Sequence, residues 1–309
     1  MIKGIFTALR ELLRTRYYRS SIRQLPPLNE PQLGYMRSAD ALVHPTALVS
    51  PEAELGSGVV IGPFAVVEGQ TRIGAGSQIG SHCVIKRFTS MGTRNRVSEH
   101  AVLGGEPQDL GFAGEESYLV IGNENVIREG VTIHRATGPG EATVVGSRNY
   151  LMCDVHIAHN CEIGDRVGIV NDTGLAGHIR VENDAFISGQ VGIVERCRIG
   201  RKAMVGGLSK VTQDVPPFCT ANGIPAVLIG LNLRGLESAG IQGVQIRNLE
   251  EAYQLLSAHR PVPEESLEKM AHLHDPLVDE LIAFIRSSTR GFCRVRRRIE
   301  QRTTGAEDD

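Results

Sequence analysis

An aliphatic residue recurs every six positions through the middle of this chain, and this repeat restricts the fold more than any other feature. From Val43 to Val211, 26 of the 29 positions at that spacing are aliphatic or methionine, and only Asp109, Glu115 and Pro139 break the series. In a chain of ordinary composition about a third would be aliphatic, so chance does not explain the pattern. A period of six is neither helical nor a simple strand alternation. It predicts short strands stacked as a parallel β-helix of about nine or ten coils, with three hexads to each coil.

Two further features share this register. The residue after the aliphatic is often glycine, as at Gly74 and Gly164, and the residue two before it is often small, as at Ala65 and Cys83. Glycine suits a backbone that must bend at a corner, and a small side chain suits a tight inward position. A core of stacked aliphatic residues also explains a chain without tryptophan. The three breaks in the series indicate two loops that leave the coil, near 104–120 and 136–143.

Four parts of the chain follow from these patterns. We expect an N-terminal extension at 1–40, a β-helix at 41–228, a helical domain at 229–292 and a charged tail at 293–309. The stretches "IQGVQIRNLEEAYQLL" and "DPLVDELIAFIRSS" place apolar residues three and four apart, which predicts the C-terminal helices.

Residues 1–24 form a basic amphipathic pattern. One helical stripe is apolar, and six lysines and arginines stand against the single acid Glu11. Such a helix can lie on an anionic membrane surface, or it can dock on its own protein or a neighbouring subunit; stripe and charge do not separate these alternatives.

Composition narrows the class of protein. A formal net charge of −2 gives no reason to expect a nucleic-acid partner. The six cysteines include no CxxC pair, so we interpret them as reduced packing thiols of a cytoplasmic protein. No apolar run reaches the roughly 18 residues that would span a membrane.

Several motifs resemble one family, the UDP-N-acetylglucosamine O-acyltransferases that begin lipid A synthesis. They are, in the family's order, "VHPTALV", "PQDLGFAGE", "IREGVTIHRAT", "HIAHNCEIG", "LAGHIRV", "MVGGLSKVTQDVPPF", "GLNLRGL" and "SSTRGF", and they cover roughly residues 43 to 292. The hexads alone are similar to the wider superfamily of hexapeptide-repeat acyltransferases. The resemblance implies a left-handed coil, although the general preference for right-handed crossovers favours the opposite hand. It also implies a homotrimer with active clefts between neighbouring coils.

The resemblance assigns catalytic roles in "HIAHNCEIG" and "LAGHIRV". His159 matches the general base, which takes a proton from the sugar 3-hydroxyl as that oxygen attacks an acyl thioester. Imidazole suits this role because its unperturbed pKa of about 6.5 leaves it mostly neutral in the cytosol. Gly177 matches the residue whose N–H stabilises the developing oxyanion, and His178 follows it. The acyl donor would be acyl carrier protein through its phosphopantetheine, with no other cofactor.

Substrate-binding positions also follow from the resemblance. Gln108 and Asp109 match loop residues that contact the sugar, and His134 and His156 match neighbours of the active cleft. Gly207 matches a glycine beside the acyl groove, and "GLNLRGL" supplies Asn232 and Arg234. From the strand alternation, His156 points outward between the inward Val155 and Ile157.

Other readings of the histidines remain. They could be ordinary surface residues of a repeat. They could also hold zinc, as in γ-class carbonic anhydrases built on the same coil, but those place two ligands in an HxxxxH pattern that "HIAH" lacks.

Four departures from the family bear on the acceptor. Gly111 stands where a lysine is usual, and "VERC" places Val194, Glu195 and Arg196 in a segment that usually reads "HQF". Glu237, Ser238 and Ala239 replace expected cations, and Asn160 replaces the aspartate that follows the base. Each charge-assisted contact to phosphate contributes about 1.5–3 kcal/mol. The loss of such contacts would weaken the binding of a UDP-sugar. Two alternatives therefore stay open: a paralogue that acts on a different acceptor, or an inactive trimeric scaffold.

Overall fold

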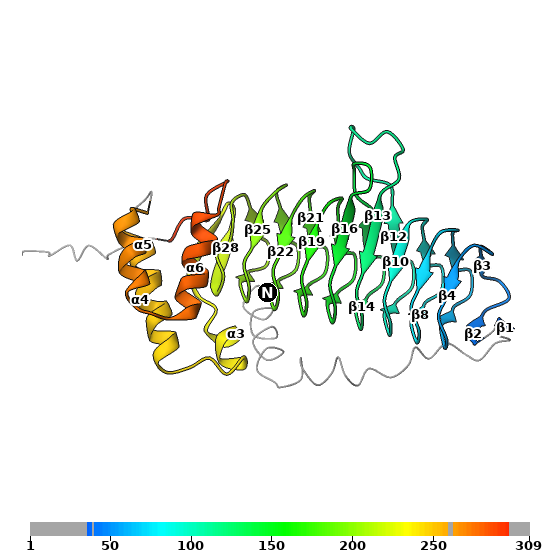
Figure 1. Ribbon diagram of the computed structural model, residues 1–309, viewed down its shortest axis with the longest axis horizontal. Helices are drawn as coiled ribbons and strands as arrows, with labels where there is room; N and C mark the ends of the chain where they lie inside the picture. The colour runs from blue at the N-terminus through cyan, green and yellow to red at the C-terminus, as the bar shows by residue number, and fades with distance from the viewer. Residues whose placement is uncertain (1–35, 39, 259–261, 297–309) are drawn as a thin grey trace, which may run out of the picture.

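The computed structural model describes residues 36–38, 40–258 and 262–296, and the amphipathic pattern at 1–24 lies outside them. Three long sheets run the length of a coil, and helices close its C-terminal end (Figure 1). Sheet 1 contains β1 (Met36–Ser38), β2 (Ala41–Val43), β5 (Val60–Ile61), β8 (Gln78–Ile79), β11 (Arg96–Val97), β14 (Val126–Ile127), β17 (Tyr150–Leu151), β20 (Gly168–Ile169), β23 (Phe186–Ile187), β26 (Met204–Val205), β28 (Cys219–Gly223) and β29 (Ala226–Leu231). Sheet 2 contains β3 (Leu48–Val49), β6 (Val66–Val67), β9 (Val84–Ile85), β12 (Val102–Gly105), β15 (Thr132–His134), β18 (His156–Ile157), β21 (Gly174–Leu175), β24 (Gly192–Ile193) and β27 (Lys210–Val211). Sheet 3 contains β4 (Glu54–Leu55), β7 (Arg72–Ile73), β10 (Thr89–Met91), β13 (Tyr118–Ile121), β16 (Ala142–Val145), β19 (Glu162–Ile163), β22 (Arg180–Val181) and β25 (Arg198–Ile199).

Successive strands of the chain go to sheets 1, 2 and 3 in turn, so each coil is a triangle. Within the coil the strands of each sheet pair in parallel, and equivalent residues of neighbouring coils face each other, as His156 faces Gly174. In the two-residue strands from β5 to β27 the second residue is the aliphatic of the hexad and is buried, as at Ile157 and Leu175. The predicted β-helix of hexapeptide repeats is confirmed.

Glycine after the aliphatic serves a purpose other than the one the sequence suggested. A Cβ on Gly74 would lie 2.5 Å from backbone atoms of Gly92 in the next coil. The coils therefore approach too closely there for any side chain. Positive φ instead occurs at the second residue of most corners, where for example Asn160 (55°) and His178 (59°) adopt the left-handed conformation.

A buried ladder of asparagines lines one inner corner of the coil. Asn95, Asn125 and Asn149 are fully buried where other coils carry small residues. The Asn125 amide donates to Asn95 Oδ1 (3.0 Å) and to the Gly146 carbonyl (2.9 Å), and its own Oδ1 accepts from the Asn149 N–H (2.9 Å). These bonds tie one coil to the next inside the core, where an unpaired polar group would be costly. Of the three amide nitrogens only that of Asn149 lacks a hydrogen-bond partner.

In the described part of the chain, four helices follow the coil: α3 (Leu233–Ser238), α4 (Val244–Ala258), α5 (Glu264–Ala271) and α6 (Pro276–Arg286). Their apolar faces form a second core that includes Phe218 from the end of the coil. Arg201 Nε and Nη2 donate to the Glu280 carboxylate (2.8 and 2.5 Å), which fixes α6 against the coil.

Candidate active site

Both loops and both motif histidines lie on one corner of the triangle. The chain passes from sheet 2 to sheet 3 between β12 and β13, between β15 and β16, between β18 and β19, and between β21 and β22. The first two passages are the loops, which project from the side of the coil (Figure 1), and the next two carry His159 and His178. Residues far apart in the sequence therefore gather on adjacent coils.

His159 and His178 are held one coil apart by the backbone. The His178 N–H donates to the His159 carbonyl (3.0 Å), and the two rings meet edge to face with centroids 5.3 Å apart. Both side chains are partly exposed, which places them outside the aliphatic core. Burial, followed by the nearby Arg196 charge, lowers the pKa of His178 below its usual value, so this ring is neutral at neutral pH.

Gly177 lies directly against the ring of His159. A Cβ at Gly177 would be 2.6 Å from both Cε1 and Nε2 of that ring, so only glycine leaves room for the imidazole in its present position. The ring edge that carries Nε2 and the Gly177 backbone therefore face a common space.

Asn160 holds the other side of the His159 ring. Asn160 Oδ1 lies 2.9 Å from His159 Nδ1 and also accepts from the Thr137 N–H (2.9 Å). Asn160 Nδ2 donates to the Thr137 carbonyl (3.0 Å), and the Asn160 N–H donates to Thr143 Oγ1 (2.8 Å). The side chain thus joins His159 to the second loop. The sequence had singled out Asn160 only as a departure from the family.

The two loops are fastened to each other. Glu115 Oε1 accepts from the Gly138 N–H (2.7 Å), and these backbone contacts lower the pKa of Glu115. Arg135, which is 4% exposed, lies over the rings of Phe112 (5.1 Å) and Phe88 (5.7 Å). The loops are therefore a single packed unit beside the histidines.

Asp109 comes from the first loop. Its Oδ1 accepts from the Gly111 N–H (2.8 Å), and this bond is the main reason that the pKa of Asp109 is lowered. The charges of His159 and His178 make smaller contributions that lower this pKa further. Gln108 precedes it and is exposed.

His134 and His156 form a second pair on sheet 2. Their rings are 4.9 Å apart and edge to face, and His156 Nδ1 lies 2.7 Å from Thr132 Oγ1. Burial lowers the pKa of His156, and burial followed by the His156 charge lowers that of His134 to about 4. Both are neutral at neutral pH, so they can exchange hydrogen bonds with a ligand without adding charge.

The C-terminal candidates lie away from this corner in the sequence of coils. Asn232 caps α3: its Oδ1 accepts from the Gly235 N–H (3.1 Å) and its Nδ2 donates to the Lys202 carbonyl (2.8 Å). Arg234 is exposed on α3, and Gly207 lies at a corner between sheets 1 and 2. Within the described residues, Asn232, Arg234 and Gly207 make no hydrogen bond or ring contact to His159.

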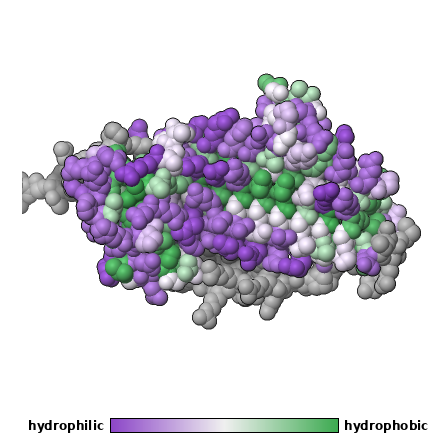
Figure 2. Space-filling model, viewed as in Figure 1, coloured by the Kyte–Doolittle hydropathy of each residue, from purple (hydrophilic) through white to green (hydrophobic). Residues whose placement is uncertain are grey.

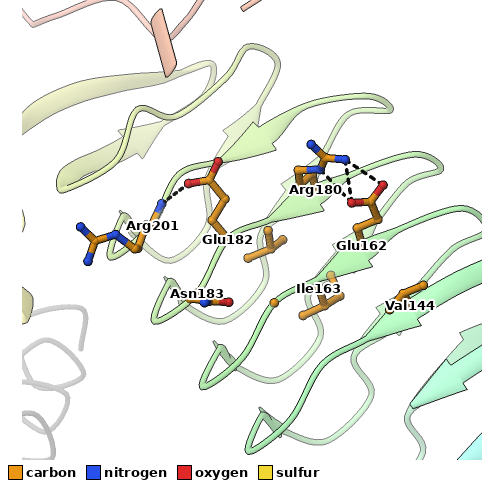
Figure 3. A pocket seen from close by; sticks show the side chains of 9 residues that line it. Val144, Glu162, Ile163, Arg180, Glu182, Asn183 and Arg201 are labelled. Atoms are coloured by element: carbon orange, nitrogen blue, oxygen red, sulfur yellow. Dashed lines mark hydrogen bonds and ion pairs between the residues drawn. The ribbon is translucent and has the colours of Figure 1, made fainter. Parts of the chain in front are cut away.

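A shallow groove of about 450 Å³ lies elsewhere, on sheet 3. Figure 3 shows that its charged side chains engage one another: Arg180 pairs with Glu162 (2.7 Å) and the Arg201 N–H donates to Glu182 (2.8 Å). No histidine lines it. On the face seen in Figure 2, apolar residues gather beneath the loops between hydrophilic borders, and Val120 and Val144 of sheet 3 are 40% and 38% exposed. Because its Arg180 and Glu162 side chains pair with each other and no histidine lines it, the groove is a weaker candidate for a site than the histidine corner.

Residues 36–38, 40–258 and 262–296 offer neither a metal-binding cluster nor a membrane-spanning helix. These ranges contain no group of three or more His, Cys, Asp or Glu side chains arranged to hold a metal ion. No helix within them has the length and apolarity to cross a membrane.

Comparison with known proteins identifies the relatives of this chain. A family model described as UDP-N-acetylglucosamine O-acyltransferase, domain 2, matches residues 214–293, and a hexapeptide-repeat model matches 52–87. The acyl-[acyl-carrier-protein]–UDP-N-acetylglucosamine O-acyltransferase of Alkalilimnicola ehrlichii is 48% identical over 255 residues, which are 82% of this chain and 99% of the relative. The enzyme of the same name from Herminiimonas arsenicoxydans is 40% identical over 261 residues, which are 82% of this chain and 100% of the relative.

Solved structures similar to this chain are of proteins with the same activity in their names. LpxA from Acinetobacter baumannii superposes with a TM-score of 0.78 at 35% identity, covering 82% of this chain and 99% of that one. The UDP-N-acetylglucosamine acyltransferase of Francisella novicida gives a TM-score of 0.78 at 32% identity, with 82% and 94% covered. These matches confirm the fold class, a left-handed parallel β-helix with small C-terminal helices. With the relatives matched over nearly their whole length, they place this chain in the UDP-N-acetylglucosamine O-acyltransferase family.

Proposed function

We propose that the protein transfers a 3-hydroxyacyl group from acyl carrier protein to the 3-hydroxyl of UDP-N-acetylglucosamine, the reaction that begins lipid A synthesis. The observation that carries this proposal is the corner at which His159, Gly177 and the two loops meet. The relatives named above bear the same activity in their names.

The geometry suits a base and an oxyanion donor acting at one point. His159 Nε2 takes the proton of the acceptor hydroxyl while that oxygen attacks the thioester carbonyl. The Gly177 N–H then donates to the carbonyl oxygen as it becomes negative. The tetrahedral intermediate collapses by breaking the carbon–sulfur bond, and the proton held by His159 passes to the departing phosphopantetheine sulfur. His178 remains neutral and packs against the base.

The remaining candidates have supporting roles in this proposal. Gln108 and Asp109 would bind the sugar, and the neutral His134 and His156 would line the cleft. Gly207 would leave room for the acyl chain, and Asn232 and Arg234 would contact the donor or nucleotide from another subunit.

A homotrimer would complete the cleft. The outward residues of β3, β6, β9 and β12 are all aliphatic, namely Leu48, Val66, Val84 and Val102, and Leu48 is 68% exposed. An aliphatic column of this kind on an outer face favours contact with another copy. Sedimentation should give the mass of a trimer for the wild-type protein. The double variant Leu48→Glu, Val66→Glu should sediment as a monomer. A wild-type protein that is monomeric at micromolar concentration would argue against the trimer.

A paralogue acting on another acceptor is the second candidate, and the state of the cations favours it. Arg196 pairs with Glu195 (3.1 Å) and Arg180 with Glu162 (2.7 Å), so each of these arginines has an acidic neighbour that competes with a diphosphate. The decisive assay offers labelled 3-hydroxyacyl carrier protein and a panel of UDP-sugars to the purified protein. Turnover with UDP-N-acetylglucosamine supports the first proposal, turnover only with another acceptor supports the paralogue, and no turnover with any supports the scaffold.

We further propose that the protein is cytoplasmic and that residues 1–24 bring it to the inner membrane surface. The support is the charge and apolar stripe of that segment. Liposome flotation with and without residues 1–24 tests this, and equal flotation contradicts it.

A further inference from the structure

Asn160 occupies a position from which it can dictate the protonation of His159. Its amide oxygen is 2.9 Å from His159 Nδ1. An imidazole nitrogen can donate or accept at that distance, so the bond alone does not say which ring nitrogen carries the proton. The answer depends on which end of the Asn160 amide faces the ring.

The peptide of Thr137 fixes the amide orientation. Asn160 Oδ1 accepts from the Thr137 N–H (2.9 Å), and Asn160 Nδ2 donates to the Thr137 carbonyl (3.0 Å). Turning the amide over would set N–H against N–H and oxygen against oxygen, losing both bonds. The oxygen is therefore held toward His159, and an amide oxygen can only accept.

We propose that Asn160 is a positioning residue that locks His159 in the Nδ1–H tautomer and so leaves the lone pair on Nε2. The second loop, through the Thr137 peptide, is part of this lock. Nε2 is also the ring nitrogen that lies over Gly177, where a Cβ would approach it to 2.6 Å. The lone pair thus faces the same space as the Gly177 backbone.

The neutral amide does what a carboxylate could not do in this setting. An aspartate at 160 would still accept from His159 Nδ1 and from the Thr137 N–H, but its second oxygen would face the Thr137 carbonyl without a proton between them. This chain therefore joins base and loop with a group that offers both an acceptor and a donor. The kinetic consequence rests on the proposed function, whereas the tautomer does not.

Nitrogen NMR of the resting protein tests the tautomer directly. Protein labelled with ¹⁵N-histidine gives distinct shifts for protonated and unprotonated ring nitrogens, and His159→Gln identifies the His159 signals by their loss. At pH 8 we expect Nδ1 of His159 to carry the proton. A resting His159 with the proton on Nε2 would overturn the inference, whatever reaction the protein catalyses.

Three variants separate positioning from general stability. Asn160→Ala should lose the Nδ1–H preference and lower kcat roughly tenfold to a hundredfold with little change in KM. Asn160→Asp should keep Nδ1–H, because the acceptor remains. Thr143→Val removes the hydroxyl that holds the Asn160 N–H but leaves the amide in place, so the tautomer should not change. An Asn160→Ala protein that retains Nδ1–H, or a Thr143→Val protein that loses it, would contradict the proposal.

Discussion

Gly177→Ala adds a single methyl group at a point where the structure leaves no room for one. The new Cβ would lie 2.6 Å from Cε1 and Nε2 of His159, whereas carbon atoms in contact prefer about 3.5–4.0 Å. The ring must therefore retreat by about 1 Å, and it cannot do so without lengthening the 2.9 Å contact between Nδ1 and Asn160. Gly177 has no positive φ, so alanine does not strain the turn itself.

A displacement of about 1 Å in a reacting group can lower the rate about a hundredfold, and we expect a loss of this size in kcat. The stability cost should stay within about 1–3 kcal/mol because the ring is partly exposed and can move outward. The assay is steady-state transfer from labelled 3-hydroxyacyl carrier protein, with thermal unfolding measured on the same preparation. Gly192→Ala is the matched control, since a Cβ there meets nothing within 4 Å. A Gly177→Ala protein with kcat within about twofold of the parent would show that the ring's place over Gly177 is irrelevant to the rate.

Three further predictions concern the base, acid stability and the core. His159→Ala should lower kcat at least a hundredfold, since general base catalysis contributes about 10²–10⁴, and near-native turnover would remove it as the base. Burial lowers the pKa of His134 from its usual value of about 6.5 to about 4 in the folded protein. The unfolded chain therefore binds this proton first, and stability should fall as the pH drops from about 6.5 to 4. Melting temperatures across that range should fall less steeply in His134→Gln, and identical slopes would contradict this reasoning. Asn125→Ala should lower the free energy of unfolding by about 3 kcal/mol in urea titrations because it strips buried partners from both neighbouring coils, while the exposed Asn171→Ala should cost little.

The sequence predicted the coil well because the aliphatic residue of each hexad marks the position that is buried. Ile157 and Leu175 are core residues for the same reason that they are aliphatic, and 18-residue spacing alone places them on top of one another. The position of the loops was equally visible, since a break in the series at Asp109 or Glu115 means that the backbone has left the stack. Those two acids prove to accept loop N–H groups, so the breaks are also the residues that fold the first loop.

The sequence could not predict contacts that depend on a non-repeating conformation. Thr137 lies in a loop 23 residues before Asn160, and no period relates the two. The asparagine ladder was missed for a different reason: the pattern required a small inward residue, and a buried asparagine is acceptable there because backbone and side-chain groups of the neighbouring coils pair with its amide. The periodicity of one chain does not encode how copies of the chain assemble. It therefore did not predict any contact between the histidine corner of one copy and Asn232, Arg234 or Gly207 of another.

The hydrogen bond from the His178 N–H to the His159 carbonyl shows that groups at equivalent corners are separated by a whole number of coils. Neighbouring strands lie about 4.8 Å apart, and whole coils can be added or removed only in units of three hexads. During evolution, the separation between corner groups on this scaffold could therefore change only in discrete increments, whereas loop length at the same corner could vary by single residues. In a lineage that adapts to a longer or shorter substrate, a change in the number of coils would alter the separation between corner groups in large steps. A change in loop length would alter the shape of the cleft in small steps.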